Sequence, residues 1–346
     1  MSDVIGWDIG GAHIKAARVD RNGTVLAVAQ IPCALWHGLA QLHTALDAVS
    51  DKIGGAKRHV ATMTGEMVDL FVNREVGVAT IANALREHFS DTTLYFYAGG
   101  DQFVSFASVR ENVARIASAN WRAPIQLLAG KVSDALFIDI GSTTTDLIAI
   151  VDSRPQIKGH DDFTRLVTGE LVYSGVVRTP LMALTEQIAF RGESVPLMAE
   201  LFATTADVYR LTNELPPNAD QHPTADGKEK SMLASARRMA RMIGCDVESA
   251  TMEEWRNMAV AFRASQVQKL QTALDKVASL PGLGDNAAII AAGVGQFLVH
   301  SIADSTGLVY RSFGDFIHCV GVDRIAVANA APAAAVALLG LQQCFG

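Results

Sequence analysis

The sequence has few cysteines, and they are widely separated. Cys33, Cys245, Cys319 and Cys344 form no CxxC pair, no zinc-type spacing and no disulfide framework. We therefore expect free thiols in a reducing compartment. The sequence also lacks an excess of basic residues, because 29 Lys and Arg stand against 36 Asp and Glu, which gives a formal net charge of −7. This balance argues against a nucleic-acid-binding protein.

Long apolar runs are missing as well. The nearest approach, RIAVANAAPAAAVALLGLQ, contains Arg324, Asn329 and Pro332. It predicts a buried C-terminal helix that begins near Pro332 rather than a membrane span. The first residues, MSDVIGWDIGG, have neither a basic n-region nor an apolar h-region, so we expect no secretory signal. Together these absences predict a cytoplasmic protein with no membrane partner.

What is present is typical of a globular chain. The 346 residues are 49% hydrophobic and 19% charged, which suits two or three domains with proper cores. Glycine-rich or low-complexity linkers do not occur, so we expect the parts to pack closely. A monomer and a homodimer both remain open.

Two stretches share one pattern although they lie far apart. VIGWDIGGAHIKAARVD spans residues 4–20 and FIDIGSTTTDLIAI spans residues 137–150. Asp8 aligns with Asp139, an offset of 131 residues. In each stretch an apolar strand ends in Asp-x-Gly, turns tightly and returns as a second strand. The repetition predicts two related halves.

The expected order of elements supports these halves. The first half is predicted as βββ-α-β-α-β-α, and from residue 135 the order begins again with three strands. About 125 mainly helical residues, roughly 161–286, interrupt the second half and are too many for a plain loop. We expect an α/β protein with a first domain at 1–130 and a second at 131–346, whose insertion is the substrate-specific part.

The predicted strands are 3–9, 13–19, 24–31, 59–64, 93–99, 135–141, 144–151, 154–159 and 307–312. The predicted helices are 35–53, 76–89, 104–119, 230–244 and 332–343, and a strand, turn and helix are predicted over 286–303.

The chemistry of the two turns points to phosphate. A tight turn after a strand exposes several backbone N–H groups, which form a concavity that binds anions. Glycine lets the backbone approach a phosphate closely, and hydroxyls add donors. A carboxylate at the strand end can hold Mg²⁺ beside the phosphate. One glycine-containing hairpin alone is weak support, but the recurrence is more specific, so we expect the two turns to face each other and clamp a polyphosphate. The predicted phosphate-binding residues are Gly10, Gly11, Lys15, Gly141, Ser142, Thr143, Thr144 and Thr145.

A third glycine pair, Gly293 and Gly295 in AAGVGQ, follows a predicted strand and opens a helix. That position suits the approach of a nucleotide or phosphate, and it equally suits a simple tight turn. We include both glycines among the candidate substrate-binding residues.

Other polar residues have competing interpretations. Glu66 and Asp69 follow a predicted strand, where they would bind a substrate amine, take a proton or simply stabilise a helix N-terminus. Arg178 would grip a diphosphate with its guanidinium or form a structural ion pair. Asp226 and Lys228 lie in a loop that would close over substrate or form an ordinary polar turn. Trp121 is expected in the core rather than stacked on an aromatic substrate.

The two turns and several longer motifs resemble known proteins. DIGG followed by DIGSTTTD is similar to the hydantoinase/oxoprolinase branch of the sugar kinase, Hsp70 and actin superfamily, which implies two RNase H-like domains around a phosphate-binding cleft. Within that branch the chain resembles the methanofuran-biosynthesis enzymes. The motifs that carry this resemblance are TGEMVDLFVNREVGV (64–78), ASANW (117–121), GELVYSGVVRTPL (169–181), AELFATTADVYRL (199–211) and TADGKEKS (224–231).

The resemblance implies an activity. Those enzymes join an aminomethylfuran-methyl diphosphate to the phenol of γ-glutamyltyramine with release of diphosphate, and in bacteria the group accompanies tetrahydromethanopterin-linked one-carbon metabolism. The chain departs from the family at the first turn, where Ala12, His13 and Ile14 replace the Asn-Thr that typically precedes the lysine. His13 would replace the missing donor or be a partly exposed strand residue, and we favour the second.

We therefore expect a transferase whose Mg²⁺, held near Asp8 and Asp146, neutralises the leaving diphosphate. Asp8, Asp146 and Glu66 are the candidate catalytic residues, and a base would help the phenol, whose free pKa is near 10. A kinase or amidohydrolase that uses ATP is the second hypothesis, which Gly293 and Gly295 would favour. A non-catalytic ATP-sensing or scaffold protein is the third. The expected partners are thus small molecules: a furan diphosphate and a phenolic amine.

Overall fold

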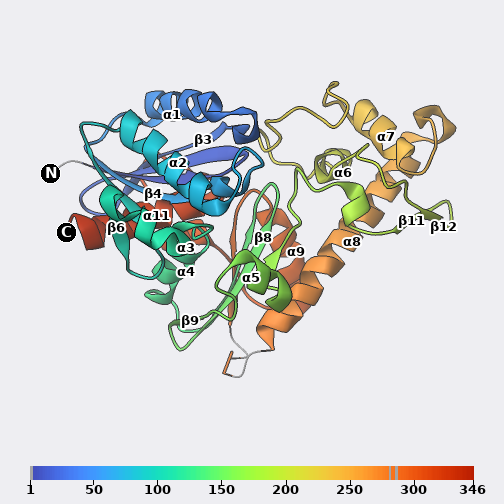
Figure 1. Ribbon diagram of the computed structural model, residues 1–346. Helices are drawn as coiled ribbons and strands as arrows, with labels where there is room; N and C mark the ends of the chain where they lie inside the picture. The colour runs from blue at the N-terminus through green and yellow to red at the C-terminus, as the bar shows by residue number, and fades with distance from the viewer. Residues whose placement is uncertain (1–2, 280–281, 285–286) are drawn as a thin grey trace. The chain divides into compact units, whose positions relative to one another are not determined.

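The computed structural model describes residues 3–279, 282–284 and 287–346 (Figure 1). The chain forms two compact units. The first contains residues 1–135, 150–156 and 311–346, and the second contains residues 136–149 and 157–310. Among the described residues, one six-stranded sheet lies in the first unit and the other six-stranded sheet lies mostly in the second unit.

The first unit contains a sheet of order β3-β2-β1-β4-β5-β6. The strands β1 to β3 are antiparallel neighbours, β1, β4 and β5 run parallel, and β6 adds an antiparallel edge. The burial of β1 on both faces explains its nearly continuous apolar sequence. The strands are β1 (Val4–Ile9), β2 (His13–Val19), β3 (Val25–Pro32), β4 (Arg58–Met63), β5 (Thr93–Tyr97) and β6 (Phe103–Ser105).

Helices cover both faces of this sheet. Ile5, Trp7 and Ile9 join the apolar core that α1 and α2 complete on one face. On the other face, α11 packs against β1, β2 and β4, and α4 packs against α11 (Figure 1). The helices of this unit are α1 (Leu39–Ile53), α2 (Arg74–His88), α3 (Val113–Ile116), α4 (Arg122–Ala129), α10 (Arg324–Asn329) and α11 (Ala331–Cys344), with short 3-10 helices at Leu35–His37, Gly65–Met67, Phe106–Ser108, Arg110–Asn112 and Phe313–Phe316.

The second sheet repeats the topology of the first. Its order is β10-β8-β7-β13-β14, with β9 also paired to β8. The strands β7, β8, β13 and β14 thus correspond to β1, β2, β4 and β5, and the place of β3 is shared by two short strands on β8. The strands are β7 (Ala135–Ile140), β8 (Thr145–Val151), β9 (Arg154–Gln156), β10 (Leu171–Val172), β13 (Ala288–Ala292) and β14 (Tyr310–Ser312).

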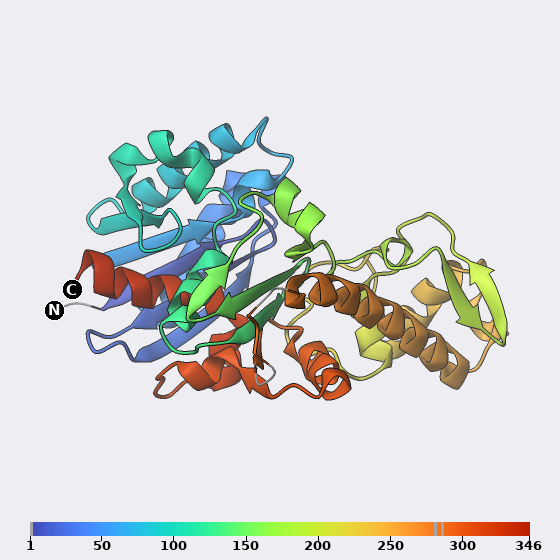
Figure 2. The same cartoon turned by 90° about the horizontal axis from the view of Figure 1, so that it is seen from below.

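Helices dominate the stretch between β10 and β13. The 27-residue α8 packs against α6, α7 and α9, and its buried residues join the core of the second unit (Figure 2). The remaining elements are α5 (Asp162–Thr168), β11 (Gln187–Phe190), β12 (Glu193–Pro196), α6 (Thr205–Leu211), α7 (Met232–Arg241), α8 (Met252–Ala278) and α9 (Gln296–Thr306), with 3-10 helices at Leu181–Ala183 and Val247–Ser249.

Most predicted elements are confirmed within one to four residues of their predicted ends, but the helix predicted over 104–119 is wrong. Phe103–Ser105 instead pairs with β5, two 3-10 turns follow, and only Val113–Ile116 is α-helical. The open edge of β5 offers these residues a backbone partner, which overrides their helical spacing. The short strands β10, β11 and β12 were not predicted. Residues 280, 281, 285 and 286 of the predicted 161–286 insertion lie outside the described residues, as does the first residue of the predicted 286–303 unit.

The predicted division at residue 130 stays a prediction, and the first compact unit also contains the later segments 150–156 and 311–346. Residues 311–346 belong to the first unit because α11 packs against its sheet. In the described part of the chain, no helix is both long enough and apolar enough to cross a lipid bilayer.

Candidate functional site

The two turns that the sequence singles out are closed in the same way. The Gly10 N–H donates to the His13 carbonyl at 3.0 Å, and the Gly141 N–H donates to the Thr144 carbonyl at 2.8 Å. Each turn therefore has two residues at its tip, and both belong to the same kind of strand pair. The turns lie in different units, so their predicted facing across a cleft stays a prediction.

In the first turn the backbone carbonyls are fixed by the segment that follows β3. The Gly11 carbonyl accepts from the Leu35 N–H at 3.1 Å, and the Ala12 carbonyl accepts from the Cys33 N–H at 2.8 Å. In a trans peptide the carbonyl and the following N–H point in opposite directions. The next two N–H groups of the turn therefore point away from this segment.

In the second turn the same arrangement uses residues 176–178. The Gly141 carbonyl accepts from the Val176 N–H at 3.1 Å, and the Ser142 carbonyl accepts from the N–H groups of Val177 and Arg178 at 3.1 and 2.8 Å. The N–H groups that follow these two carbonyls therefore point away from residues 176–178. Adjacent N–H groups with a common direction are the basis of an anion-binding concavity.

Asp8 is a buried carboxylate at the end of β1. It is only 6% exposed, and its cross-strand neighbours are Lys15 on β2 and Thr62 on β4. Cross-strand neighbours project from the same face of a sheet, so a carboxylate, an ammonium and a hydroxyl share this face. Gly6 precedes Asp8 on that face, and a Cβ there would lie 2.2 Å from the Ala333 carbonyl oxygen, so α11 requires glycine at this position.

The direction of α11 adds to the local electrostatics. Its C-terminal neighbour Phe345 stacks under the Arg58 guanidinium at the start of β4, with 5.0 Å between the guanidinium carbon and the ring centroid. The N-terminus of α11 therefore points toward the strand ends, where Asp8 lies. A helix N-terminus carries partial positive charge, which together with Lys15 favours a phosphate or a metal-bound phosphate.

The four hydroxyl residues of the second turn are not equivalent. Thr145 is fully buried, and its Oγ1 donates to the Ser174 carbonyl at 2.6 Å. Its hydroxyl proton is therefore used within the protein, and the assignment of Thr145 to a phosphate stays a prediction. Ser142, Thr143 and Thr144 are half-buried, with the Ser142 and Thr143 hydroxyl oxygens 3.4 Å apart. These are the hydroxyls that remain at the turn for a ligand.

Asp146, a predicted metal ligand, pairs with a buried cation. The Arg165 Nη2 of α5 donates to Asp146 Oδ1 at 2.9 Å and to the Glu170 carbonyl at 2.9 Å, and Arg165 is only 1% exposed. The Glu170 carboxylate is used by backbone N–H groups of Lys158 and Gly159 at 2.7 and 2.6 Å. Asp146 thus has a structural partner that competes with any metal.

The glycines of AAGVGQ pack against the end of β7. Gly293 has φ +78°, and a Cβ there would lie 2.3 Å from both Asp139 Oδ1 and the Ile140 carbonyl oxygen. The Gly295 N–H donates to that same carbonyl at 2.8 Å. The backbone therefore requires glycine at position 293 whatever binds nearby. The assignment of Gly293 and Gly295 to a ligand stays a prediction.

Glu66 is a buried carboxylate in the 3-10 turn after β4. It is 1% exposed, and its Oε1 accepts from the Ser118 hydroxyl at 2.9 Å. Gly77 of α2 lies against it, since a Cβ at Gly77 would lie 2.6 Å from the Glu66 carbonyl oxygen. Asp69, the neighbouring candidate, is exposed. The environment thus distinguishes the two carboxylates and favours Glu66 as the functional one.

Arg178 is the last residue of the segment 176–178, which binds the carbonyls of the second turn. Its side chain is half-buried, and burial lowers the pKa of its guanidinium, an effect that nearby Tyr173 opposes. Because its own N–H is bonded to Ser142, the residue is anchored to the turn. The hydrogen bond fixes the backbone of Arg178 beside the turn, and the assignment of its guanidinium to a phosphate stays a prediction.

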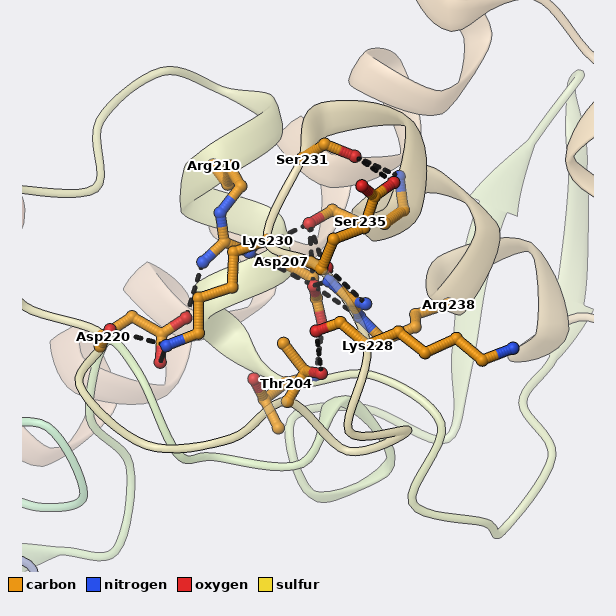
Figure 3. Close-up of polar contacts among 12 residues, drawn as sticks. Thr204, Asp207, Arg210, Asp220, Lys228, Lys230, Ser231, Ser235 and Arg238 are labelled. Atoms are coloured by element: carbon orange, nitrogen blue, oxygen red, sulfur yellow. Dashed lines mark hydrogen bonds and ion pairs between the residues drawn. The ribbon is translucent and has the colours of Figure 1, made fainter.

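The loop around Asp226 is fixed by ion pairs (Figure 3). Arg238 is fully buried, and it bonds Asp207 at 2.7 Å and Asp226 at 3.1 Å. Arg210 bonds Asp220 at 2.6 Å. Asp226 therefore has a structural task, whereas the exposed Lys228 side chain extends away from the network.

Two further expectations concern the core. Trp121 is 3% exposed, which confirms it as a core residue. His13 begins β2 as predicted, but at 7% exposure it is buried instead of partly exposed. Over the described residues there is no group of three or more His, Cys, Asp or Glu side chains placed to hold a metal ion.

Comparison with known families places these features in context. The family model for hydantoinase/oxoprolinase matches residues 57–339, which is most of the chain. The chain belongs to this family. The match includes the second turn, Arg178 and the AAGVGQ glycines, so the resemblance drawn from the motifs is confirmed.

Two relatives are both named (4-{4-[2-(γ-L-glutamylamino)ethyl]phenoxymethyl}furan-2-yl)methanamine synthase. The protein from Methanocaldococcus jannaschii is 27% identical over 308 residues, which cover 88% of this chain and 90% of the relative. The protein from Methanococcus vannielii is 29% identical over 163 residues, which cover 47% of this chain and 72% of the relative.

Solved structures support the fold. The nucleotide-free structure of an acetone carboxylase aligns with 89% of this chain and 67% of its own, with 12% identity and a TM-score of 0.57. The predicted fold class, an actin, Hsp70 and sugar kinase-like α/β protein with two RNase H-like halves, is confirmed.

Several residues around the second turn were not predicted from the sequence. They are Arg165 on α5, Gln266 on α8, and Ser174, Gly175 and Thr179 in the segment 174–179 after β10, here called the brace. The sequence could have indicated Gln266, because it is a polar residue at helical spacing from the apolar Phe262 and Leu270, with which it shares the buried face of α8. The others lie within or near the motif GELVYSGVVRTPL, from which only Arg178 was selected.

Proposed function

We propose that this chain is a transferase that joins an aminomethylfuran-methyl diphosphate to the phenol oxygen of γ-glutamyltyramine or a related tyrosine derivative. The observation that carries the proposal is the match to the Methanocaldococcus protein over 88% of this chain, because the name of that relative describes a phenoxymethyl-furan amine as its product. The reaction belongs to the assembly of a methanofuran-type one-carbon carrier.

The bonds that change define the task of the site. The phenol loses its proton, its oxygen bonds to the methylene on the furan ring, and diphosphate leaves that methylene with the electron pair of the broken C–O bond. The furan ring stabilises positive charge on the methylene, so the barrier depends mainly on the charge that develops on the leaving group. Preorganised donors aimed at developing charge are the most effective catalytic device available to a protein.

The second turn provides such donors. Its two N–H groups share a direction because the carbonyls of Gly141 and Ser142 are bound by residues 176–178. The half-buried hydroxyls of Ser142, Thr143 and Thr144 and the anchored Arg178 add further positive or donor groups. We assign the diphosphate of the substrate to this turn.

Mg²⁺ fits the same chemistry, and we propose Asp8 as the carboxylate that holds it. Mg²⁺ is bound by oxygen ligands and usually needs only one or two carboxylates, because waters and substrate phosphates fill the other positions. The buried Asp8 carboxylate lies opposite the Thr62 hydroxyl and suits this role. Asp146 suits it less well, since Arg165 already neutralises its charge. When bound, the metal would neutralise charge on a phosphate group.

Glu66 is the proposed acceptor of the phenol proton. Its carboxylate is buried and oriented by the Ser118 hydroxyl, so it is held in one position. A phenol has a free pKa near 10 and needs either a base or a strongly polarising environment to react at neutral pH.

The test is a direct assay of the purified protein. We expect the furan-methyl diphosphate, γ-glutamyltyramine and Mg²⁺ to give the aryl ether and diphosphate in equal amounts, measured by mass spectrometry and a diphosphate assay. Tyramine and tyrosine in place of γ-glutamyltyramine would define the acceptor. No ether with any phenol, together with ATP hydrolysis that depends on a small substrate, would replace this proposal with an ATP-dependent kinase or amidohydrolase.

A further inference from the structure

We infer that Gln266 of α8 and Tyr209 of α6 are positioning residues for the phosphate-binding turn, and that they act on it through Gly175. The inference rests on the proposed function, because it assigns the diphosphate to the turn at 141–144. It concerns residues that touch neither substrate in that proposal. All the contacts that support it lie within the second unit.

The first step is the contact between Gly175 and the turn. A Cβ built on Gly175 would lie 2.4 Å from both the Ser142 carbonyl carbon and the Thr143 nitrogen, and 2.6 Å from the Gly141 carbonyl oxygen. The backbone of residue 175 is therefore pressed against the peptide at the tip of the turn. Any displacement of Gly175 would rotate or displace that peptide, since packed backbones have no room between them.

The second step is the set of bonds that fixes Gly175. Its carbonyl accepts from three side chains: Gln266 Nε2 at 2.9 Å, Thr205 Oγ1 at 2.9 Å and Thr179 Oγ1 at 3.1 Å. Its N–H donates to Thr179 Oγ1 at 2.7 Å. These donors come from α8, from α6 and from the brace itself, so two helices determine where the carbonyl of residue 175 lies.

The third step is the orientation of the Gln266 amide. Gln266 is fully buried, and its Nε2 donates both to the Gly175 carbonyl and to the Ser174 hydroxyl, each at 2.9 Å. Its Oε1 accepts from the hydroxyl of Tyr209, which is also fully buried. Burial raises the pKa of that phenol, so it stays protonated and donates. The amide group is thus satisfied on both sides and cannot turn without losing a bond.

An apolar side chain would fill this position of α8 more simply. The neighbours of Gln266 in the helix core include Phe262 and Leu270, and burying an amide costs free energy that its bonds must offset. What the amide supplies, and leucine could not, is a pair of donors aimed at residues 174 and 175. Because the backbone of residue 175 packs directly against the turn, the amide determines the geometry of the diphosphate site.

Gln266→Leu and Tyr209→Phe test the inference, with inorganic diphosphate and Mg²⁺ as the probe. We expect Gln266→Leu to weaken diphosphate binding at least tenfold by calorimetry and Tyr209→Phe to weaken it severalfold. In steady-state kinetics the furan-diphosphate KM should rise and kcat should fall, whereas the KM for the phenol should stay the same. A loss confined to thermal stability would mean that the network is only structural and would overturn the inference.

Trp255→Phe is the matched control. Trp255 lies on the same helix, is fully buried and donates one hydrogen bond, from its Nε1 to the Val247 carbonyl at 2.9 Å, away from the turn. We expect this variant to lose stability but to bind diphosphate as the parent does. If Gln266→Leu does not fold, Tyr209→Phe, which removes a single hydroxyl, decides the question alone.

The outcomes separate the inference from the proposed function. If the parent binds diphosphate and both variants bind it equally well, the positioning role is contradicted and the transferase proposal stays intact. A parent protein that forms no ether and binds no diphosphate would overturn both.

Discussion

Gly175 determines how closely the brace approaches the phosphate turn. We predict that Gly175→Ala lowers affinity for Mg²⁺-diphosphate by more than tenfold, because the added methyl would lie 2.4 Å from backbone atoms of Ser142 and Thr143. Backbone cannot yield as a flexible side chain can. Isothermal calorimetry measures the effect. Gly55→Ala is the control, since a Cβ at Gly55 meets nothing within 4 Å, and unchanged affinity in Gly175→Ala would refute the close packing.

The two aspartates should respond differently to the same substitution. We predict that Asp146→Asn lowers the free energy of unfolding by about 3 kcal/mol, because Arg165 is buried and would lose its carboxylate partner. Asp8→Asn should instead leave the fold intact and lower kcat about a hundredfold or more, because the transition state loses several kcal/mol of electrostatic stabilisation. Urea unfolding and kcat at saturating Mg²⁺ distinguish the two. Equal stability of both variants would show that the Asp146–Arg165 pair contributes nothing to the fold.

The sequence could predict the candidate residues of the turns, but not which of their side chains bond within the protein and which remain for a ligand. Glycine, hydroxyl and carboxylate residues next to a strand end identify a phosphate site by their chemistry alone. That Thr145 points inward, or that Asp146 meets Arg165, depends on contacts between segments about 20 to 30 residues apart in the chain, which no local pattern records.

Elements with a strong apolar pattern were predictable for a physical reason. The strands β1 and β7 are buried on both faces, and their continuous apolar residues have no competing helical period. The segment 104–119 failed because its outcome depends on the free edge of β5, a tertiary feature. The two-residue β10 is too short to leave any periodicity, and it exists because β8 offers it an edge.

A buried histidine on β4 makes a pH-dependent contribution to stability. His59 accepts from Trp7 Nε1 at 3.1 Å and stacks on Phe89 with ring centroids 4.0 Å apart. Burial lowers its pKa from 6.5 to about 4. As the pH falls below 6.5, the histidine of the unfolded chain binds a proton, whereas His59 in the folded protein stays neutral down to about pH 4. The contribution of His59 to the free energy of unfolding is therefore complete above pH 6.5 and is lost as the pH falls from 6.5 to about 4.

We predict that this single group accounts for about 3 kcal/mol of stability lost between those two pH values. Urea unfolding at several pH values checks the slope. His59→Asn removes the titrating group and should flatten the slope, whatever its effect at neutral pH. An unchanged slope in His59→Asn would assign the acid sensitivity to other residues.

At the scale of the whole molecule, the internal repeat is the feature that the sequence predicted best. Two strand-turn-strand units 131 residues apart do begin two sheets of the same topology. The path of the C-terminus was not predictable in the same way. The sequence of a helix rich in alanine and leucine does not indicate which sheet the helix covers. The helix α11 packs on the sheet of the first unit, where Gly6 and Gly340 allow close contact.

A ligand comparison tests what the whole chain binds. We predict that Mg²⁺-diphosphate raises the melting temperature at least as much as Mg²⁺-ADP at equal concentration, because the proposed substrate offers a diphosphate without an adenosine. A ligand that binds only the folded state stabilises it by mass action, so the shifts rank the affinities. Large shifts with ADP and ATP and none with diphosphate would favour the nucleotide-dependent alternative.

The most direct test of the central claim follows the oxygen of the phenol. The purified protein is incubated with the furan-methyl diphosphate, Mg²⁺ and γ-glutamyltyramine carrying ¹⁸O in its phenol, and both products are analysed by mass spectrometry. Attack by the phenol on the methylene predicts that all of the label appears in the ether and none in the diphosphate. Label in a phosphate product, or label that stays entirely in unreacted phenol, would show that the phenol oxygen does not attack the methylene.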